Sequence, residues 1–226
     1  MNWQTANMFK WARGHKQTLT VKAIKFAAKR HKGDKRDDGI TDFIDHPVRA
    51  CQILINLSVK NDVILAAVIL HDTVEMKRAT HGEVISVCGP EVAFLVDLVS
   101  RKPGELLEYY YERISRDIRA ILVKAADNLH NLNTMIGVFP ADKLEENIKK
   151  SEDFVVPMIK KAQIDYPEYR EILDILEDRI RAKLDEVKVY LKQVRARDKL
   201  HEVFSITELA ERKEALLALD SERRET

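Results

Sequence analysis

The sequence predicts an all-α fold: a helical bundle followed by a C-terminal extension that is one long helix. Only seven Gly and six Pro occur in 226 residues, so few positions favour a turn or end a helix. Apolar residues recur at intervals of three and four along most of the chain, whereas the alternation of a half-buried strand is scarce. Together these observations indicate helices from one end of the chain to the other.

Capping chemistry marks several of the expected helix starts. Thr80–Glu83 and Ser205–Glu208 fit the S/T-x-x-E capping box, and Asp165–Glu168 is its acidic variant. Pro90 stands where a helix can begin without losing an internal hydrogen bond. In chain order, the expected helices cover residues 3–13, 20–31, 46–57, 61–76, 80–88, 90–101, 105–115, 117–135, 140–164, 167–200 and 205–222.

Two regions differ from these regular helices. Residues 32–45 form the one long polar connection, and loops of that length inside compact domains are often functional. Residues 166–226 form the helical extension and follow a domain expected over residues 1–165. An apolar stripe on the extension either packs back onto the domain or forms the seam of a homo-oligomer. The stripe consists of Leu173, Leu176, Ile180, Leu184, Val187, Leu191 and Val194.

The composition favours a soluble, cytoplasmic protein. Apolar residues make up 45% and charged residues 33%, and no apolar run approaches the roughly 20 residues of a membrane span. Cys51 and Cys88 lie apart among apolar residues, as buried thiols in a reducing compartment do. Residues 1–40 hold ten Lys or Arg against three Asp, which fits either an anionic ligand or a solvated surface. No nucleic-acid-binding motif accompanies these charges, so neither nucleic acid nor membrane is an expected partner.

Candidate metal ligands appear where apolar helices turn polar. The string LAAVILHDTVE places His71 and Asp72 side by side at the end of a buried helix, with Glu75 projecting to the same side. An imidazole nitrogen and a carboxylate oxygen can bind one ion, and such a mixed set favours Mn, Fe or Zn over Ca. Taken alone, an HD dipeptide is common and indicates little.

Two further segments strengthen the prediction of a metal site. His46 begins a helix directly after the polar connection. Asp127 lies in the second apolar helix, ILVKAADNLHNLNT, where Asn131 and Thr134 share its face. Buried polar groups on such a face need partners, which a metal ion and a polar ligand would supply. His130 lies off this face and is interpreted as a structural residue or as a donor to a metal ligand.

The ordered motifs resemble a known family. The chain contains the ordered set H…HD…D, with HDxxE and KxADxxHNxxT around it. This set is similar to that of the hydrolase domain of the RelA/SpoT family and its small stand-alone relatives in the HD superfamily. The resemblance runs from about Ala23 to Pro157. It implies an HD-type helical bundle over residues 1–165 that acts as a phosphohydrolase. The chain past Pro157 is too short and too helical for a nucleotidyl-transfer domain, so alarmone synthesis is not expected.

The resemblance also implies roles for individual residues. His46, His71, Asp72 and Asp127 would bind one divalent ion, typically Mn²⁺. The catalytic residues would be Glu75, which assists the attacking water, and Asn131. Substrate would be bound by Arg36, Lys32, Lys102, Asn131 and Thr134. The family's usual substrate is guanosine tetra- or pentaphosphate, which loses its 3′-pyrophosphate. Basic side chains at the mouth, which also include Lys35 and Arg101, would steer such a polyanion inward.

Departures from the family pattern leave the reaction open. Met76 stands where the family usually has a second carboxylate, and Asp37 and Asp38 follow Arg36 where basic and small residues are common. Either Glu75 alone suffices, or turnover is reduced or the substrate changed. The alternatives to a (p)ppGpp hydrolase are therefore a phosphatase acting on a nucleoside monophosphate or NADPH, and a weakened nucleotide-binding or partner-binding module.

Overall fold

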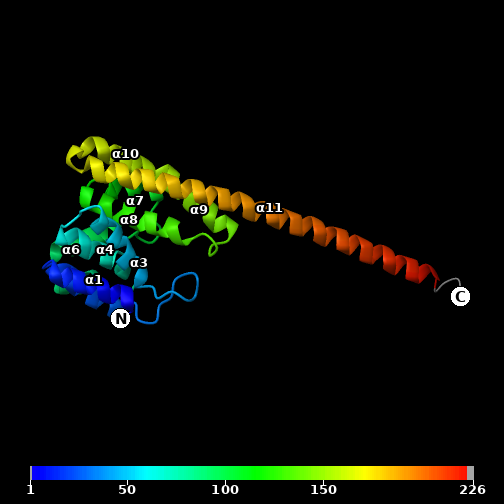
Figure 1. The fold of residues 1–226 in the computed structure, drawn as a ribbon, viewed down its shortest axis with the longest axis horizontal. Coiled ribbons are helices and arrows are strands. Elements are labelled where there is room, and N and C mark those ends of the chain that lie inside the picture. Colours follow the sequence, from blue (N-terminus) through cyan, green and yellow to red (C-terminus); the bar gives the residue numbers. More distant parts are fainter. Residues whose placement is uncertain (1, 223–226) are drawn as a thin grey trace.

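The fold is all-α, as predicted. A computed structural model describes residues 2–222, with side chains through residue 201, and no strand is assigned in that part of the chain (Figure 1). The helices in chain order are α1 (Trp3–Gly14), α2 (Thr18–Arg30), α3 (Asp45–Asn56), α4 (Asp62–Glu75), α5 (His81–Cys88), α6 (Pro90–Val99), α7 (Leu107–Ile114), α8 (Ile118–Thr134), α9 (Ala141–Lys150), α10 (Val156–Asp165) and α11 (Arg170–Glu222).

Helix α4 forms the centre of the bundle. Residues 64–71 along it are all buried, and it packs against α2, α3, α6 and α8. A helix that is apolar on all sides is stable only when other elements surround it, as they do here. Asn61 caps its first turn by accepting hydrogen bonds from the amides of Val63 (3.0 Å) and Ile64 (3.1 Å). The end of this helix therefore has a fixed place inside the bundle.

Helix α8 is the second central element. It packs against α3, α4, α6, α10 and α11, and its apolar residues from Ala120 to Leu132 are buried. Polar residues Asp127, Asn128 and His130 are buried as well, with exposed fractions of 5%, 5% and 6%. Buried polar side chains require partners, so this face of α8 must meet complementary groups on its neighbours.

The polar connection before α3 is an ordered turn. Lys35 and Asp42 form an isolated antiparallel bridge, and the Arg36 amide donates to the Thr41 carbonyl at 2.9 Å. Gly39 adopts a φ of +70° at the tip, a conformation that side chains with a Cβ rarely take. The turn therefore holds Arg36 at a defined position.

One predicted helix is interrupted. The expected helix over residues 140–164 is instead α9, a π-helical turn at Ser151–Val155, and α10. Pro157 explains the change: it has no N–H for the carbonyl of Asp153, and its ring would collide with that carbonyl in a regular α-helix. A wider turn just before the proline relieves this conflict.

Another predicted break is absent. Helix α11 runs without interruption from Arg170 to Glu222, so the expected stop between residues 200 and 205 is wrong. Residues 168–226 contain no Gly or Pro, and an interior serine costs a helix little. The Thr80–Glu83 capping box is confirmed, whereas Asp165 pairs with Lys161 (2.8 Å) instead of capping a helix. The side chains of the Ser205–Glu208 box lie outside the described residues.

The first half of α11 packs onto the body of the protein. Its stripe is buried from Leu173 through Leu191 against α8, α9 and α10. The second half continues away from the bundle in Figure 1. Packing onto the body is thus the observed arrangement for the first half, while the oligomer seam and the boundary at residue 165 remain predictions. No helix in the described part of the chain combines the length and hydropathy needed to cross a membrane.

Candidate metal centre

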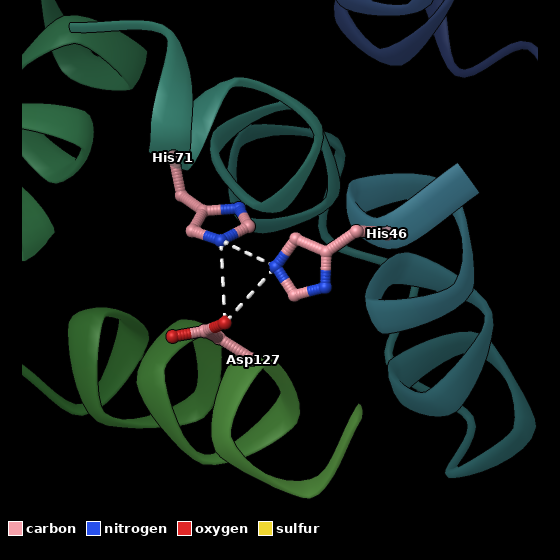
Figure 2. Close-up of side chains that lie close together, drawn as sticks. All are labelled: His46, His71 and Asp127. Atoms are coloured by element: carbon pink, nitrogen blue, oxygen red, sulfur yellow. Dashed lines mark hydrogen bonds and ion pairs between the residues drawn. The ribbon is translucent and has the colours of Figure 1, made fainter. Parts of the chain in front are cut away.

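Three side chains from three different helices meet at one point. His46 from α3, His71 from α4 and Asp127 from α8 turn toward one another in Figure 2. The two Nε2 atoms lie 3.2 Å apart. Asp127 Oδ1 lies 3.1 Å from Nε2 of His46 and 3.4 Å from Nε2 of His71. These separations are short enough for one small cation to contact all three atoms.

Asp72 adds a fourth donor to this group. Its Oδ2 lies 3.4 Å from Nε2 of His46 and 3.2 Å from Nε2 of His71. The side chain of Asp72 is 22% exposed, whereas the histidines are at most 4% exposed. The structure therefore brings all four predicted ligands together, and Asp72 is the one nearest to solvent.

The backbone explains why these residues converge. His46 lies in the first turn of α3, where Pro47 is tolerated because early helical amides have no internal partner. His71 and Asp72 lie in the last turn of α4, and Asp127 lies midway along α8. Because α4 packs against both α3 and α8, the donors meet inside a rigid frame of helices.

On each histidine Nδ1 is hydrogen-bonded elsewhere, and Nε2 faces the other donors. Nδ1 of His71 donates to the Val68 carbonyl at 2.7 Å, so the neutral form of His71 carries its lone pair on Nε2. Nδ1 of His46 lies 2.8 Å from Nδ1 of His130. Burial, followed by the charges of His46 and Arg36, lowers the pKa of His130 to about 3, so His130 is neutral and its Nδ1 can accept a hydrogen bond from Nδ1 of His46. When His46 donates from Nδ1, the lone pair of its Nε2 is available, as a metal ligand requires.

The electrostatics of the group favour a cation. Burial alone would raise the pKa of Asp127, but the ammonium of Lys124 and hydrogen bonds from His46 and His71 hold it well below its usual range. Burial alone would lower the pKa of His71, but Asp72 and Asp127 raise it to about 9. These surroundings thus stabilise positive charge at His71 Nε2. The donors and their charges fit a divalent ion.

A polar chain links the donor group to Arg36. Asn131 donates from Nδ2 to Asp127 Oδ1 at 2.7 Å and accepts from Arg36 Nη2 at 2.9 Å. The same Nη2 lies 3.4 Å from the Thr134 hydroxyl oxygen. The Arg36 guanidinium lies 5.6 Å from the centre of the Phe43 ring. Asn131 therefore connects a candidate metal ligand to a candidate substrate contact.

A cavity of about 640 Å³ lies beside this chain. Its walls include Arg36, His46, Arg49, His130, Thr134 and Phe139. Three carboxylates also line it. Asp37 pairs with Lys143, Asp38 accepts from the Ile40 and Thr41 amides, and Asp45 accepts from Asn2. Each carboxylate therefore has a partner, and that of Asp37 is a cation.

Other predicted contacts lie elsewhere. Lys102 pairs with Asp97, Lys35 pairs with Asp42, and the Arg101 guanidinium donates to the Glu105 carbonyl. Lys32 is exposed and is not among the residues that line the cavity. Of the basic residues expected at the mouth, Arg36 is the one that lines it. Sequence reasoning missed Arg49, although its position three residues after His46 on α3 places both on one face.

Glu75 is held at the end of α4. Its Oε2 accepts a hydrogen bond from the Arg101 amide at 2.9 Å. Met76 follows as the residue that ends the helix and is half-buried. Since a thioether is only a weak acceptor, Met76 cannot replace a carboxylate beside a water.

The comparisons with known proteins agree with this geometry. Residues 23–103 match the family model described as HD domain, and an HD domain implies a divalent metal. A "GTP pyrophosphokinase rsh" from Brucella melitensis is 34% identical over 153 residues, covering 63% of this chain and 20% of that protein. A "Guanosine-3′,5′-bis(diphosphate) 3′-pyrophosphohydrolase" from Haemophilus influenzae is 29% identical over 147 residues, covering 60% and 21%. The chain thus spans about a fifth of the length of these curated relatives.

A solved structure has the same fold. It is described as a metazoan ortholog of SpoT that hydrolyses ppGpp, and it matches with a TM-score of 0.57 at 25% identity. The match covers 75% of this chain and 93% of that one. The neighbour is therefore similar across nearly its whole length.

Proposed function

We propose that this chain, which is homologous to the RelA/SpoT proteins through its HD domain, is a metal-dependent phosphohydrolase acting on guanosine tetra- or pentaphosphate. Water would cleave the bond between the 3′ oxygen and its phosphorus. The water oxygen leaves on pyrophosphate, and a proton passes to the 3′ oxygen. The products are pyrophosphate and GDP or GTP.

The proposed reaction uses two neighbouring regions, the candidate metal centre and the cavity. A divalent ion held by His46, His71, Asp72 and Asp127 would lower the pKa of a water and offset charge on the phosphoryl oxygens. Glu75, three residues after Asp72 on α4, would take the proton of that water. These residues lie on helices that the core holds in place, so the proposed site needs little rearrangement to act.

The cavity would take the nucleoside. Arg36 lies at its edge, where a planar guanidinium can stack on a purine. Asn131 and Thr134 lie within hydrogen-bond distance of Arg36 and would contact the same nucleotide. Lys32 and Lys102 would act at longer range as steering charges. The finer assignment of Mn²⁺ rests on the mixed nitrogen and oxygen donors, which suit that ion.

One observation carries the proposal: two imidazole nitrogens and two carboxylates converge within 3.1–3.4 Å, directly beside a nucleotide-sized cavity. The test is incubation of the purified chain with ppGpp and Mn²⁺. We expect GDP and pyrophosphate from the wild type and loss of both products in Asp127→Ala. A folded, Mn²⁺-loaded chain that leaves ppGpp intact would contradict the proposal.

A second candidate is a phosphatase for another nucleotide. It is favoured by Asp37, Asp38 and Asp45 in the cavity wall, because carboxylates there disfavour a second pyrophosphate. A panel of phosphorylated nucleotides that includes NADPH and nucleoside monophosphates distinguishes the two, because inorganic phosphate would replace pyrophosphate as the product. Running Met76→Asp alongside shows whether a second carboxylate raises turnover. If that variant gains no activity yet binds nucleotide tightly, a binding module is favoured.

A further inference from the structure

The connection between α6 and α7 holds the proposed water-activating residue. Glu75 accepts a hydrogen bond from the backbone amide of Arg101, 2.9 Å away. Arg101 belongs to residues 100–106, which connect the two helices. Among the described residues, this amide is the one hydrogen-bond partner of the Glu75 carboxylate. The contacts that orient this amide come from α7.

The end of α6 is closed by side chains from α7. Arg113 donates from Nη1 to the carbonyls of Asp97 and Leu98, both at 2.8 Å, and from Nη2 to that of Ser100 at 3.2 Å. The Tyr110 hydroxyl donates to the Val99 carbonyl at 2.6 Å. The last carbonyls of a helix lack internal partners, and a cation there also meets the negative end of the helix dipole. Arg113 and Tyr110 thus satisfy every carbonyl from residue 97 to residue 100.

The same arginine also fixes the far side of the connection. Arg113 binds Glu105 through Nε to Oε1 (3.1 Å) and Nη2 to Oε2 (2.9 Å), and such paired contacts restrict orientation. Glu105 in turn accepts from the Lys102 amide at 2.9 Å, and its carbonyl accepts from the Arg101 guanidinium at 2.8 Å. The side chains of Arg113 and Glu105 are only 23% and 15% exposed. The connection is therefore a closed ring of contacts with Arg113 at its centre.

We infer that Arg113 is a positioning residue: by holding both ends of this connection it orients the Arg101 amide, and through that amide it orients Glu75. The inference rests on the proposed function, in which Glu75 assists the water. Arg113 itself contacts neither the donor group nor the cavity among the described residues. We therefore expect its effect on the reaction to pass through Glu75.

A double-mutant cycle separates positioning from general stability. We expect Arg113→Gln to lower kcat about 10- to 100-fold, as displacement of a catalytic group does, with KM changed less than about twofold. In a Glu75→Ala background the same change should cost less than about twofold, because residues acting through one group are not additive. Additive losses in the double variant would overturn the inference.

Matched variants control for the loss of a charged side chain. Arg116 lies two residues after the end of α7, and among the described residues its side chain pairs only with exposed Glu112. Arg116→Gln should therefore keep wild-type kcat. Arg113→Lys keeps the charge but cannot reach all of the acceptors, so it should fall between the wild type and Arg113→Gln. Thermal unfolding of each variant verifies that it is folded, and Arg113→Lys carries the test if Arg113→Gln is not.

Amide hydrogen exchange gives a readout that needs no substrate. Exchange at Arg101 should quicken in Glu75→Ala, Arg113→Gln and Arg113→Lys, and should stay unchanged in Arg116→Gln. An unchanged Arg101 rate in both Arg113 variants would refute the inference, whatever the substrate proves to be. If exchange at Arg101 quickens in stably folded Arg113 variants but the wild type leaves ppGpp intact, the positioning role is upheld and the proposed substrate is rejected.

Discussion

The candidate metal centre and the cavity beside it are built in different ways. Every donor of the metal centre lies on α3, α4 or α8, and these helices pack against one another in the core. The cavity combines helix faces with the turn that carries Arg36 and with residues after α8, such as Phe139. Chemistry that tolerates no displacement is thus placed on rigid elements, whereas recognition is placed on connections that can vary without disturbing the core.

The largest expected effect comes from removing a donor. His71→Ala should lower kcat/KM by more than about 100-fold, because loss of a residue that only hydrogen-bonds to a metal ligand already costs about 10- to 100-fold. The cavity does not include His71, so binding of GDP measured by calorimetry should change little. A parallel loss of GDP binding would show that the two regions are not separable.

Metal affinity should also depend steeply on pH. The pKa of His71 is raised to about 9 without metal, so below that pH an ion must displace a proton. The raised pKa favours the protonated form at low pH, and affinity therefore increases as pH rises. We expect about a tenfold gain per pH unit between pH 7 and 9 and a plateau above it. Titrations with Mn²⁺ across this range measure it, and a flat profile would exclude proton displacement at His71.

Asn131 is the residue that joins the two regions. Asn131→Ala removes a hydrogen bond to Asp127 and another to Arg36. We expect metal affinity to fall about 10-fold and KM to rise by a similar factor, in the range found for partners of metal ligands. If only metal affinity or only KM changes, Asn131 supports the metal centre alone or the cavity alone. Asn133→Ala, an exposed neighbour in the cavity wall, is the control for metal affinity.

The smallest effect should appear at the cavity edge. Arg36→Ala should raise KM about tenfold. This factor corresponds to roughly 1.4 kcal/mol, the contribution expected of a stacked or hydrogen-bonded guanidinium. Mn²⁺ affinity should stay within about twofold, because Arg36 reaches Asp127 only through Asn131. A large loss of Mn²⁺ affinity would mean that the turn helps to build the metal centre.

The same division explains what could be read from the sequence. His71, Asp72 and Asp127 were predictable because they interrupt apolar helical patterns whose packing follows from their periodicity, and His46 because it begins a helix directly after the polar connection. Lys102 was predicted as a substrate contact but pairs with Asp97, because the course of a connection depends on contacts that no periodicity records. Arg113 gave no signal either, since its partners become visible only when α7 is placed against the end of α6.

Equilibrium binding of Mn²⁺ tests the central claim most directly. Calorimetric titration of the purified chain should give one ion per chain, and Asp127→Ala, verified as folded by circular dichroism, should bind at least about 100-fold more weakly. Because Asp127 is the donor shared by the metal centre and the Asn131–Arg36 chain, its loss cannot be offset by another residue there. Equal affinity in the wild type and the variant would contradict the four-donor site.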